Sequence, residues 1–459
     1  MEDGHPMITT DAAPARRPRM VLVAADVVGG RMAGPGMRVV EIAKQMSRVA
    51  DVTLAVNSSG DDDGLNTIGV HVASYRDSDE LSVLIEQHDI AYCQLIDQAV
   101  VRRGIAAGCR FIFDLYNALP AEAVGAERVG GFDTQPEKDT VFRDVLSFFR
   151  FCVRAGSYFV TSNERQRDFW IGYMMAADAL LPSSLRGRHP AEIIGLVPFG
   201  MEETPPASST HPLRGTRGIG ADDTILLWAG GIWDWFDAET PIRAVADLRQ
   251  TRPDLHLVFY GTTHPNALIG KPRTVERAQR LAADLGVLDV GVHFIEGWVP
   301  AAERAGFLLD ADAAVSTHKE SFETRYAFRT RILDHFWAQL PSLVSEGDWF
   351  ADYIAQHDLG EVVPYRDVDS TRAAIESLLD AERRVAIQTH ILGIRDDWSW
   401  SATTAPLREV VASWTTSLLP GLLTEDPLMS TPEPPRRSRA REFVSRTPVG
   451  AIYRRLRKR

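Results

Sequence analysis

A glycine-rich loop between an apolar run and an amphipathic segment is the first part of the sequence that could bind a ligand. Residues 20–26 form a short run that is apolar up to Asp26, and apolar residues recur at helical spacing over 37–46. Glycines let main-chain amides approach a phosphate or sugar closely, at a helix start that favours negative charge. A tight turn without a ligand is the alternative, because the spacing is not G-x-G-x-x-G. The loop glycines are Gly29, Gly30, Gly34 and Gly36.

Polar residues follow the apolar run 111–113, where a strand of an α/β domain would end. Asp114 and Asn117 are the candidates for contact with a substrate, and Asp114 could take a proton from a hydroxyl group. The alternative for Asp114 is the N-cap of a following helix. The next turn of this kind, residues 162–167, has no role that the sequence defines.

His318 follows the apolar run 313–316 and would face the same kind of strand edge. It is a candidate for ligand contact, although a lone histidine is more often packed and hydrogen bonded. No cluster of His, Cys or carboxylate residues has the spacing of metal ligands, so we expect neither a metal nor another cofactor.

The elements that would position these residues are short buried strands alternating with helices. Strands are predicted over 52–56, 90–94, 111–114 and 158–161, and again over 224–229, 255–260, 292–295 and 313–316. Two successive doubly wound parallel-sheet domains of the α/β class explain this order, with ligands in a cleft at the carboxyl ends of their strands.

The Pro-, Ser- and Thr-rich segment 202–217 predicts the connection between the domains. We therefore assign 1–18 to a flexible N-terminus, 19–200 to the first domain and 201–395 to the second. A helix at about 396–417 would pack back on the first domain, and 418–459 would form a Pro-rich linker and a basic tail.

The composition is that of a soluble globular protein, with 45% hydrophobic and 24% charged residues in a chain of 459. No run approaches the roughly 18 apolar residues of a membrane span, and the first residues lack the apolar core of a signal peptide. We expect a cytoplasmic protein. Cys93, Cys109 and Cys152 are odd in number, which argues against a disulfide framework and favours small buried residues.

The charge is unevenly distributed. Residues 435–459 carry ten Arg or Lys and one Glu, a net +9, whereas the whole chain carries −12, which leaves −21 for residues 1–434. We expect no nucleic-acid binding by this acidic body. Ile452, Tyr453 and Leu456 would share one face of a short helix in the tail, which predicts a peripheral contact with an anionic membrane surface; a solvated disordered tail is the alternative.

Several segments in order resemble the retaining glycosyltransferases of the glycogen-synthase-like and sucrose-synthase-like group, also called glycosyl transferases group 1 or family 4-like. After the glycine-rich loop these are 197–200, 228–231, 294–300 and 320–348, and the resemblance covers about 20–415. It implies the GT-B architecture, in which two Rossmann-like domains face a central cleft, and a nucleotide-sugar donor bound mainly by the second domain.

The resemblance assigns roles to the run 320–341. Asp334 lies where the group has the acid that binds the nucleotide ribose, and its two oxygens suit a vicinal diol. Tyr326 stands where the group has an earlier acid, so Glu323 or, as the second choice, Glu320 would contact the sugar, unless both are solvated loop charges. His318 would contact the donor.

Many members of the group carry an Arg and a Lys just after a glycine pair, to neutralise the diphosphate. Here Gly230 and Gly231 are followed by the sequence Ile-Trp-Asp-Trp-Phe-Asp, without a cation. A cation from the later run would replace them; the candidates are Arg325, Arg329 and Arg331. Because Arg329 and Arg331 are two apart, we expect one at the phosphate and the other in a structural ion pair.

The resemblance therefore predicts a hexosyl- or related glycosyltransferase that transfers a sugar, with retention, to a glycan or lipid-linked acceptor in cell-surface polysaccharide synthesis. Two alternatives stay open. One is a GT-B-fold epimerase or phosphorylase, and the other is a catalytically silent module that binds nucleotide sugars, which the missing Arg and Lys favour.

Overall fold

The structure is a computed structural model that describes residues 16–29, 32–57, 65, 68–125, 134–185, 187–262, 273–297, 299–300 and 303–424. The N-terminal residues 1–15, Gly30 and the basic tail lie outside these ranges. What the sequence predicts for them stays a prediction.

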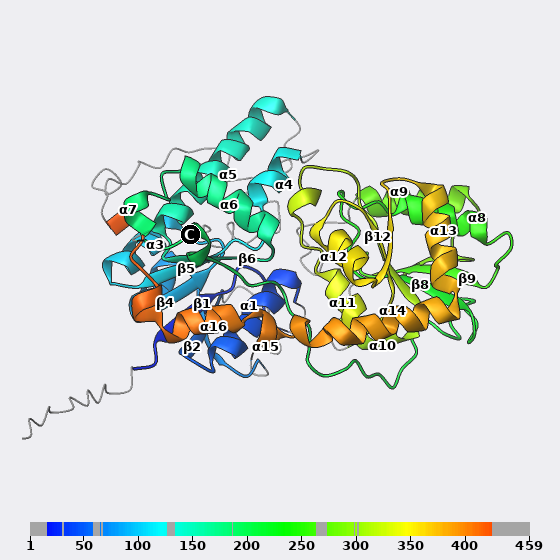
Figure 1. Ribbon diagram of the computed structural model, residues 1–459, viewed down its shortest axis with the longest axis horizontal. Coiled ribbons are helices and arrows are strands. Elements are labelled where there is room, and N and C mark those ends of the chain that lie inside the picture. The colour runs from blue at the N-terminus through cyan, green and yellow to red at the C-terminus, as the bar shows by residue number, and fades with distance from the viewer. Residues whose placement is uncertain are drawn as a thin grey trace, which may run out of the picture.

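The first unit is a seven-stranded parallel sheet, in the order β3-β2-β1-β4-β5-β6-β7, covered by helices (Figure 1). Its strands are β1 (Arg19–Val23), β2 (Asp51–Asn57), β3 (His71–Tyr75), β4 (Ile90–Cys93), β5 (Arg110–Asp114), β6 (Tyr158–Thr161) and β7 (Ile194–Leu196). Its helices are α1 (Gly34–Met46), α2 (Ser78–Glu86), α3 (Gln98–Ala106), α4 (Leu119–Gly125), α5 (Gln135–Ala155), α6 (Glu164–Ala176), α7 (Pro182–Leu185) and the 3-10 turn η2 (Pro190–Glu192).

The second unit is a six-stranded parallel sheet in the order β10-β9-β8-β11-β12-β13. Its strands are β8 (Thr224–Trp228), β9 (Leu255–Phe259), β10 (Val292–Phe294), β11 (Ala313–Ser316), β12 (Ser342–Ser345) and β13 (Gly360–Val363). Its helices are α8 (Glu239–Leu248), α9 (Arg273–Asp284), α10 (Arg304–Asp310), η4 (Thr324–Tyr326), α11 (Arg331–Trp337), α12 (Trp349–His357), α13 (Val368–Leu379) and α14 (Ala381–Ile394). Both sheets have the Rossmann-like strand order, which confirms the predicted fold class.

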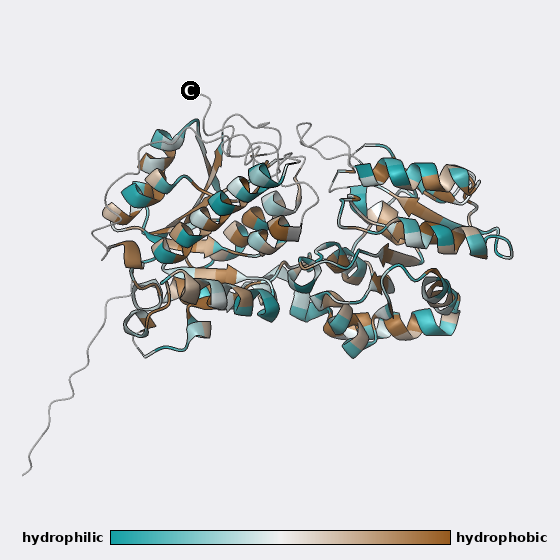
Figure 2. Cartoon of the chain, turned by 90° about the horizontal axis from the view of Figure 1, so that it is seen from above, coloured by the Kyte–Doolittle hydropathy of each residue, from teal (hydrophilic) through white to brown (hydrophobic). Residues whose placement is uncertain are grey.

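Burial explains why these sequences form parallel strands. All four residues of β4, β6, β11 and β12 are buried, as expected when helices cover both faces of a sheet. Helix α9 is amphipathic, because its buried residues Thr274, Val275, Ala278 and Ala282 lie on one face of the helix. Figure 2 shows the same division, with apolar strands between helices that are polar on their outer sides.

The chain passes between the units twice, and the two passages pair. Met201, after β7, forms a parallel bridge with Ser399, and its amide donates to the Trp398 carbonyl at 2.7 Å. After α14 the chain continues through η5 (Arg395–Trp398) and α15 (Trp400–Thr403) to α16 (Ala405–Ala412), which lies along the first unit (Figure 1). Two further short elements follow, α17 (Trp414–Ser417) and η6 (Leu422–Thr424).

The final helices pack on the first unit. Residues of α15 and α16 contact α1, and the Arg408 guanidinium donates to the Gln45 side-chain oxygen at 3.3 Å. The Ser417 carbonyl accepts from Arg188 at 3.2 Å. Residues 202–217, the predicted connection, form turns and bends. The residue limits assigned to the domains remain a prediction.

Candidate functional site

The glycine-rich loop leads from β1 into α1, as the sequence predicts. Gly29 has a φ of +139°, which favours glycine, and a Cβ on Gly36 would lie 2.3 Å from the Val27 carbonyl oxygen. Gly34 has more room, because a Cβ there would be 4.0 Å from the Phe199 ring. The α1 start has no side-chain cap among the described residues, and Pro35 in its first turn has no N–H to donate.

Asp114 ends β5 but is not placed as a general base. Its carboxylate accepts from Arg38 at 2.6 and 3.0 Å and from the Tyr92 hydroxyl at 2.6 Å. Both Asp114 and Arg38 are buried, and Arg38 also donates to the Val197 carbonyl at 2.8 Å. These contacts do not support the expected base role, which stays a prediction: the carboxylate is paired with Arg38, a residue 76 positions away in the sequence. The N-cap alternative is wrong, since α4 starts at Leu119.

Asn117 belongs to a series of hydrogen-bonded polar side chains that extends toward the second unit. Its side-chain oxygen accepts from Gln94 at 3.1 Å, and its side chain is hydrogen bonded to Glu122 of α4. Burial raises the pKa of Glu122 to about 7; the nearby carboxylate of Glu323 raises it further, and Arg329 opposes both. Glu122 thus brings a second carboxyl group close to that of Glu323. No motif in the sequence around Glu122 marks it as a site residue.

In the run 320–341, Glu323 and Arg329 form a bidentate ion pair with distances of 2.8 and 2.9 Å. The Nε of Arg329 lies 3.7 Å from Asp348, which caps α12 by accepting from the Ala351 amide. Burial raises the pKa of Asp348 to about 6, against the effect of Arg329. An ion pair for Arg329 agrees with the expectation that one of the two arginines is structural.

His318 is fully buried beside this ion pair. Its Nδ1 lies 3.8 Å from Asp348, and its Nε2 is 3.2 Å from the Glu346 carbonyl oxygen. Burial, with Arg329 as the second cause, lowers the pKa of His318 to about 3, so the ring is neutral at ordinary pH. By contrast, the side chains of Glu320 and Arg325 are exposed.

Arg331 lies against the glycine pair that follows β8. Its Nη2 donates to the Gly231 carbonyl at 2.6 Å, and its guanidinium is stacked 4.0 Å from the centre of the Phe236 ring. Its Nη1 is buried and has no partner among the described residues. Burial, then Arg329, lowers the pKa of Arg331 to about 9. Gly230 has a φ of +108°, so this turn requires glycine.

Asp334 lies one turn further along α11 and faces Arg304 of α10, at 3.2 Å. Burial raises the pKa of Asp334, and Arg304 and Arg331 lower it. The Arg304 guanidinium also stacks 5.3 Å from the Trp337 ring centre. A carboxylate whose ionised form depends on neighbouring guanidinium groups is suited to accept hydrogen bonds from hydroxyl groups.

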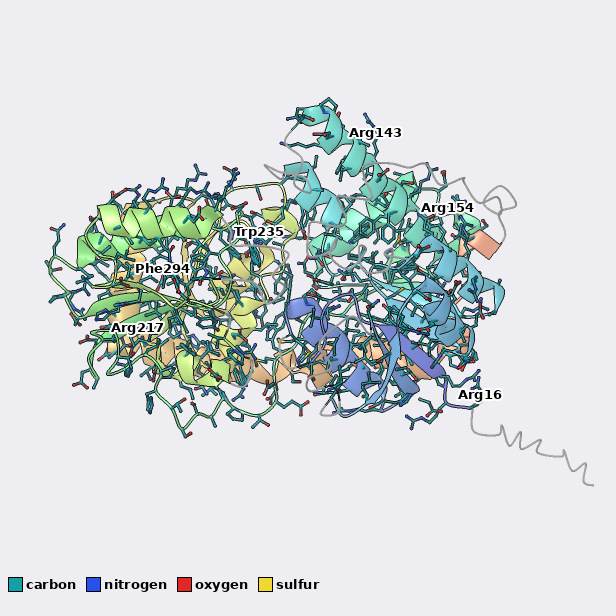
Figure 3. The ribbon with its side chains drawn as sticks, turned by 180° about the vertical axis from the view of Figure 1, so that it is seen from behind. Arg16, Arg143, Arg154, Arg217, Trp235 and Phe294 are labelled. Carbon is teal, nitrogen blue, oxygen red and sulfur yellow. The ribbon has the colours of Figure 1, made fainter. Side chains whose placement is uncertain are left out.

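Lys319 is a further cation of the site, and no sequence motif marks it. Its ammonium donates to the Asp234 carbonyl at 2.7 Å, and its amide donates to the Trp235 carbonyl at 3.0 Å. Burial, and Arg277 as the second cause, lower the pKa of Lys319. Figure 3 labels Trp235 on the side of the second unit that is nearest the first. Lys319 therefore lies beside the segment that lacks the Arg and Lys of the resembled group.

The described residues contain neither a membrane span nor a metal cluster. None of the helices there is long and apolar enough to cross a membrane. Within the same ranges, no group of three or more His, Cys, Asp or Glu side chains is arranged to hold a metal ion. Independence of a metal remains a prediction. The three cysteines are free and buried, as predicted.

No family model matches the chain, and no curated protein matches it in sequence. Solved structures do match its fold. HepE of Anabaena in complex with UDP and glucose has a TM-score of 0.62 and 13% identity, over 86% of this chain and 100% of that one. Sucrose-phosphate synthase of Thermosynechococcus elongatus has a TM-score of 0.59 and 14% identity, over 87% and 100%.

WaaG, a glycosyltransferase involved in lipopolysaccharide biosynthesis, has a TM-score of 0.58 and 16% identity, over 86% of this chain and 99% of its own. All three similarities extend over both sheets. The chain therefore has the GT-B fold of these proteins.

Proposed function

We propose that the chain is a glycosyltransferase that moves a sugar from a nucleotide-sugar donor to an acceptor. The observation that carries the proposal is the position of Arg331, whose guanidinium lies on the Gly230–Gly231 turn with one buried nitrogen that lacks a described partner. A fixed cation there would stabilise the charge that develops on a departing nucleoside diphosphate. Lys319, beside the same turn, would add a second charge.

The other polar groups fit the two ends of such a donor. Asp334 would accept from the ribose hydroxyls, and Glu323, held by Arg329, would accept from the sugar. The exposed residues Glu320 and Arg325 are weaker candidates for donor contact. His318 is neutral and buried, and its Nε2 lies 3.2 Å from the Glu346 carbonyl oxygen, so we assign it a structural role beside Arg329 rather than donor contact.

The acceptor would lie on the first unit, against Asn117 and the glycine-rich loop. Glu122, which has a pKa of about 7, is suited to accept a proton from an acceptor hydroxyl. We propose a glycan or lipid-linked acceptor of cell-surface polysaccharide synthesis, transfer with retention, and no requirement for a metal ion. Among the similar structures, HepE holds UDP and glucose and WaaG belongs to lipopolysaccharide synthesis, which supports this choice.

The basic tail supports a location at the inner face of the plasma membrane, where its net charge of +9 would meet anionic lipids.

A thermal-shift screen of nucleoside diphosphates and nucleotide sugars tests the donor class. A ligand at about 100 times its dissociation constant adds about 2.7 kcal/mol to the free energy of unfolding. We expect stabilisation by one base and not by the others, and UDP is the first to test. A folded protein that no nucleotide stabilises would contradict the proposal.

A further inference from the structure

The turn after β6, residues 162–167, has no role that the sequence defines, and the structure places it across the boundary between the units. We propose that Arg165 and Gln166, with Asn163, are positioning residues of the first unit that hold the donor segment 323–329 of the second unit in its binding geometry. That residues 323–329 bind the donor rests on the proposed function, whereas the contacts of this segment with the first unit are observed in the structure.

Three successive carbonyl groups of the donor segment are bound by these side chains. Arg165 donates to the Arg325 carbonyl at 3.4 Å, Gln166 donates to that of Tyr326 at 2.8 Å, and Asn163 donates to that of Ala327 at 3.5 Å. The 3-10 turn η4 spans Thr324–Tyr326, so these bonds hold the turn that separates Glu323 from Arg329.

The two amide side chains are oriented by bonds within their own turn. The Asn163 oxygen caps α6 by accepting from the Gln166 amide at 2.9 Å, and the Gln166 oxygen accepts from the Ser162 amide at 2.9 Å. Asn163 and Gln166 are each only 1% exposed. The oxygen of each amide accepts within the first unit, and the nitrogen of each donates to the second unit.

Arg165 and its neighbours extend the contact to α12. Arg165 donates to the Gly347 carbonyl at 2.9 Å and forms an ion pair with Asp352. Glu164 accepts from the Trp349 indole nitrogen at 2.9 Å. Gly347 directly precedes Asp348, the acid beside Arg329 and His318. The turn 162–167 therefore contacts both the donor segment and the residues around Asp348, which together surround the buried Arg329.

Four consecutive residues of one helix start thus bind both the donor segment and the strand-to-helix turn behind it. Since the main chain of the donor segment is held from the other unit, the position of Glu323 depends on how the two units meet. Loss of the contacts would free η4 and weaken donor binding without removing any group that touches the donor.

The test compares Arg165→Ala and Gln166→Leu with Arg167→Ala as the matched control. Arg167 lies on the same helix, and its side chain has no partner among the described residues. Hydrogen exchange of residues 320–329 is measured first, in the ligand-free protein, because it needs no knowledge of the donor. We expect exchange in this segment to be about tenfold faster or more in the first two variants and unchanged in the control.

Steady-state kinetics then separate positioning from simple destabilisation. Both variants should raise KM for the donor about tenfold and change kcat less, at a temperature where each is fully folded by circular dichroism. The proposal is overturned if hydrogen exchange of residues 320–329 is unchanged in the two variants, or if it is accelerated equally in the Arg167→Ala control. Faster exchange in a protein whose wild-type form binds no nucleotide sugar would keep the contact role and reject the proposed function instead.

Discussion

The guanidinium of Arg331 and the carbonyl of Gly231 are 2.6 Å apart, although the two residues are separated by 100 positions in the sequence. The bond joins the start of α11 to the turn after β8, and so places a buried positive charge beside the Gly230–Gly231 pair. Arg331 lies across the Phe236 ring, and its buried Nη1 has no hydrogen-bond partner among the described residues.

Replacement of this cation tests its role at the leaving group. Arg331→Met keeps much of the side-chain volume and removes the charge, so we expect the rate of donor cleavage to fall about a hundredfold. Arg167→Ala, at a residue of α6 whose side chain has no partner among the described residues, is the control and should retain activity. A near-normal rate for Arg331→Met would show that Arg331 does not stabilise the leaving phosphate, and Lys319 would be the next candidate.

Asp334→Asn should weaken the binding of the donor by about 1.5–3 kcal/mol, because a ribose diol would lose a charged acceptor. Isothermal calorimetry with the nucleotide alone measures this change. The unfolding temperature is the necessary check, since Arg304 loses the nearer of its two ion-pair partners in the same variant. Unchanged affinity in a folded variant would show that Asp334 does not bind the nucleotide.

Much of the fold could be predicted from apolar runs, and the strands that were not predicted lack a long continuous run of this kind. Strand β3 was not predicted because it lies at a sheet edge and is mostly partly exposed, so its sequence, HVASY, lacks a continuous apolar run. Strand β7 has only three residues, and β12 and β13 mix serine, glycine and glutamate with valine. The helix start at Gly34 is three residues earlier than the apolar periodicity indicates.

The site was predicted less completely, since its contacts join distant residues. The sequence singled out Asp114 correctly as a polar residue at a strand end, but its partner Arg38 lies on α1 and could not be inferred from spacing. Glu122 and Lys319 have no motif around them. Only the packing of α4 toward Glu323, and of Lys319 toward Asp234, identifies them.

Stability should fall in mild acid because of a buried histidine pair away from the site. His256 and His293 are 3.0 Å apart, and burial lowers the pKa of His293 to about 4. Its folded-state pKa lies below the unfolded value, so its contribution is complete above about pH 6.5 and is lost as the pH falls toward 4.

At about pH 5 the titration of His293 lowers the free energy of unfolding by about 1–2 kcal/mol. His293→Gln removes the titration, so the wild type should lose more stability than the variant between about pH 7.5 and pH 5. Urea unfolding at both pH values measures it. Parallel losses in the two proteins would mean that His293 does not titrate in this way.

The tail should bind anionic vesicles. Its residues are outside the described part of the chain, and its net charge of +9 carries the prediction, at about 1 kcal/mol for each cation near the lipid. The full chain and a form truncated after Glu433 are compared by co-sedimentation, with anionic and neutral lipids and at two salt concentrations. Equal pelleting of both forms, or binding indifferent to salt, would contradict an electrostatic anchor.

The most direct test of the proposed activity is the release of nucleoside diphosphate from a panel of nucleotide sugars, with EDTA present and with polysaccharide or lipid-linked acceptors added. We predict slow hydrolysis of at least one donor, acceleration by an acceptor, and loss of both with Arg331→Met. If the folded wild type binds a nucleotide sugar but releases no diphosphate with any acceptor, the chain is a silent binding module, and Arg331 is not a catalytic cation.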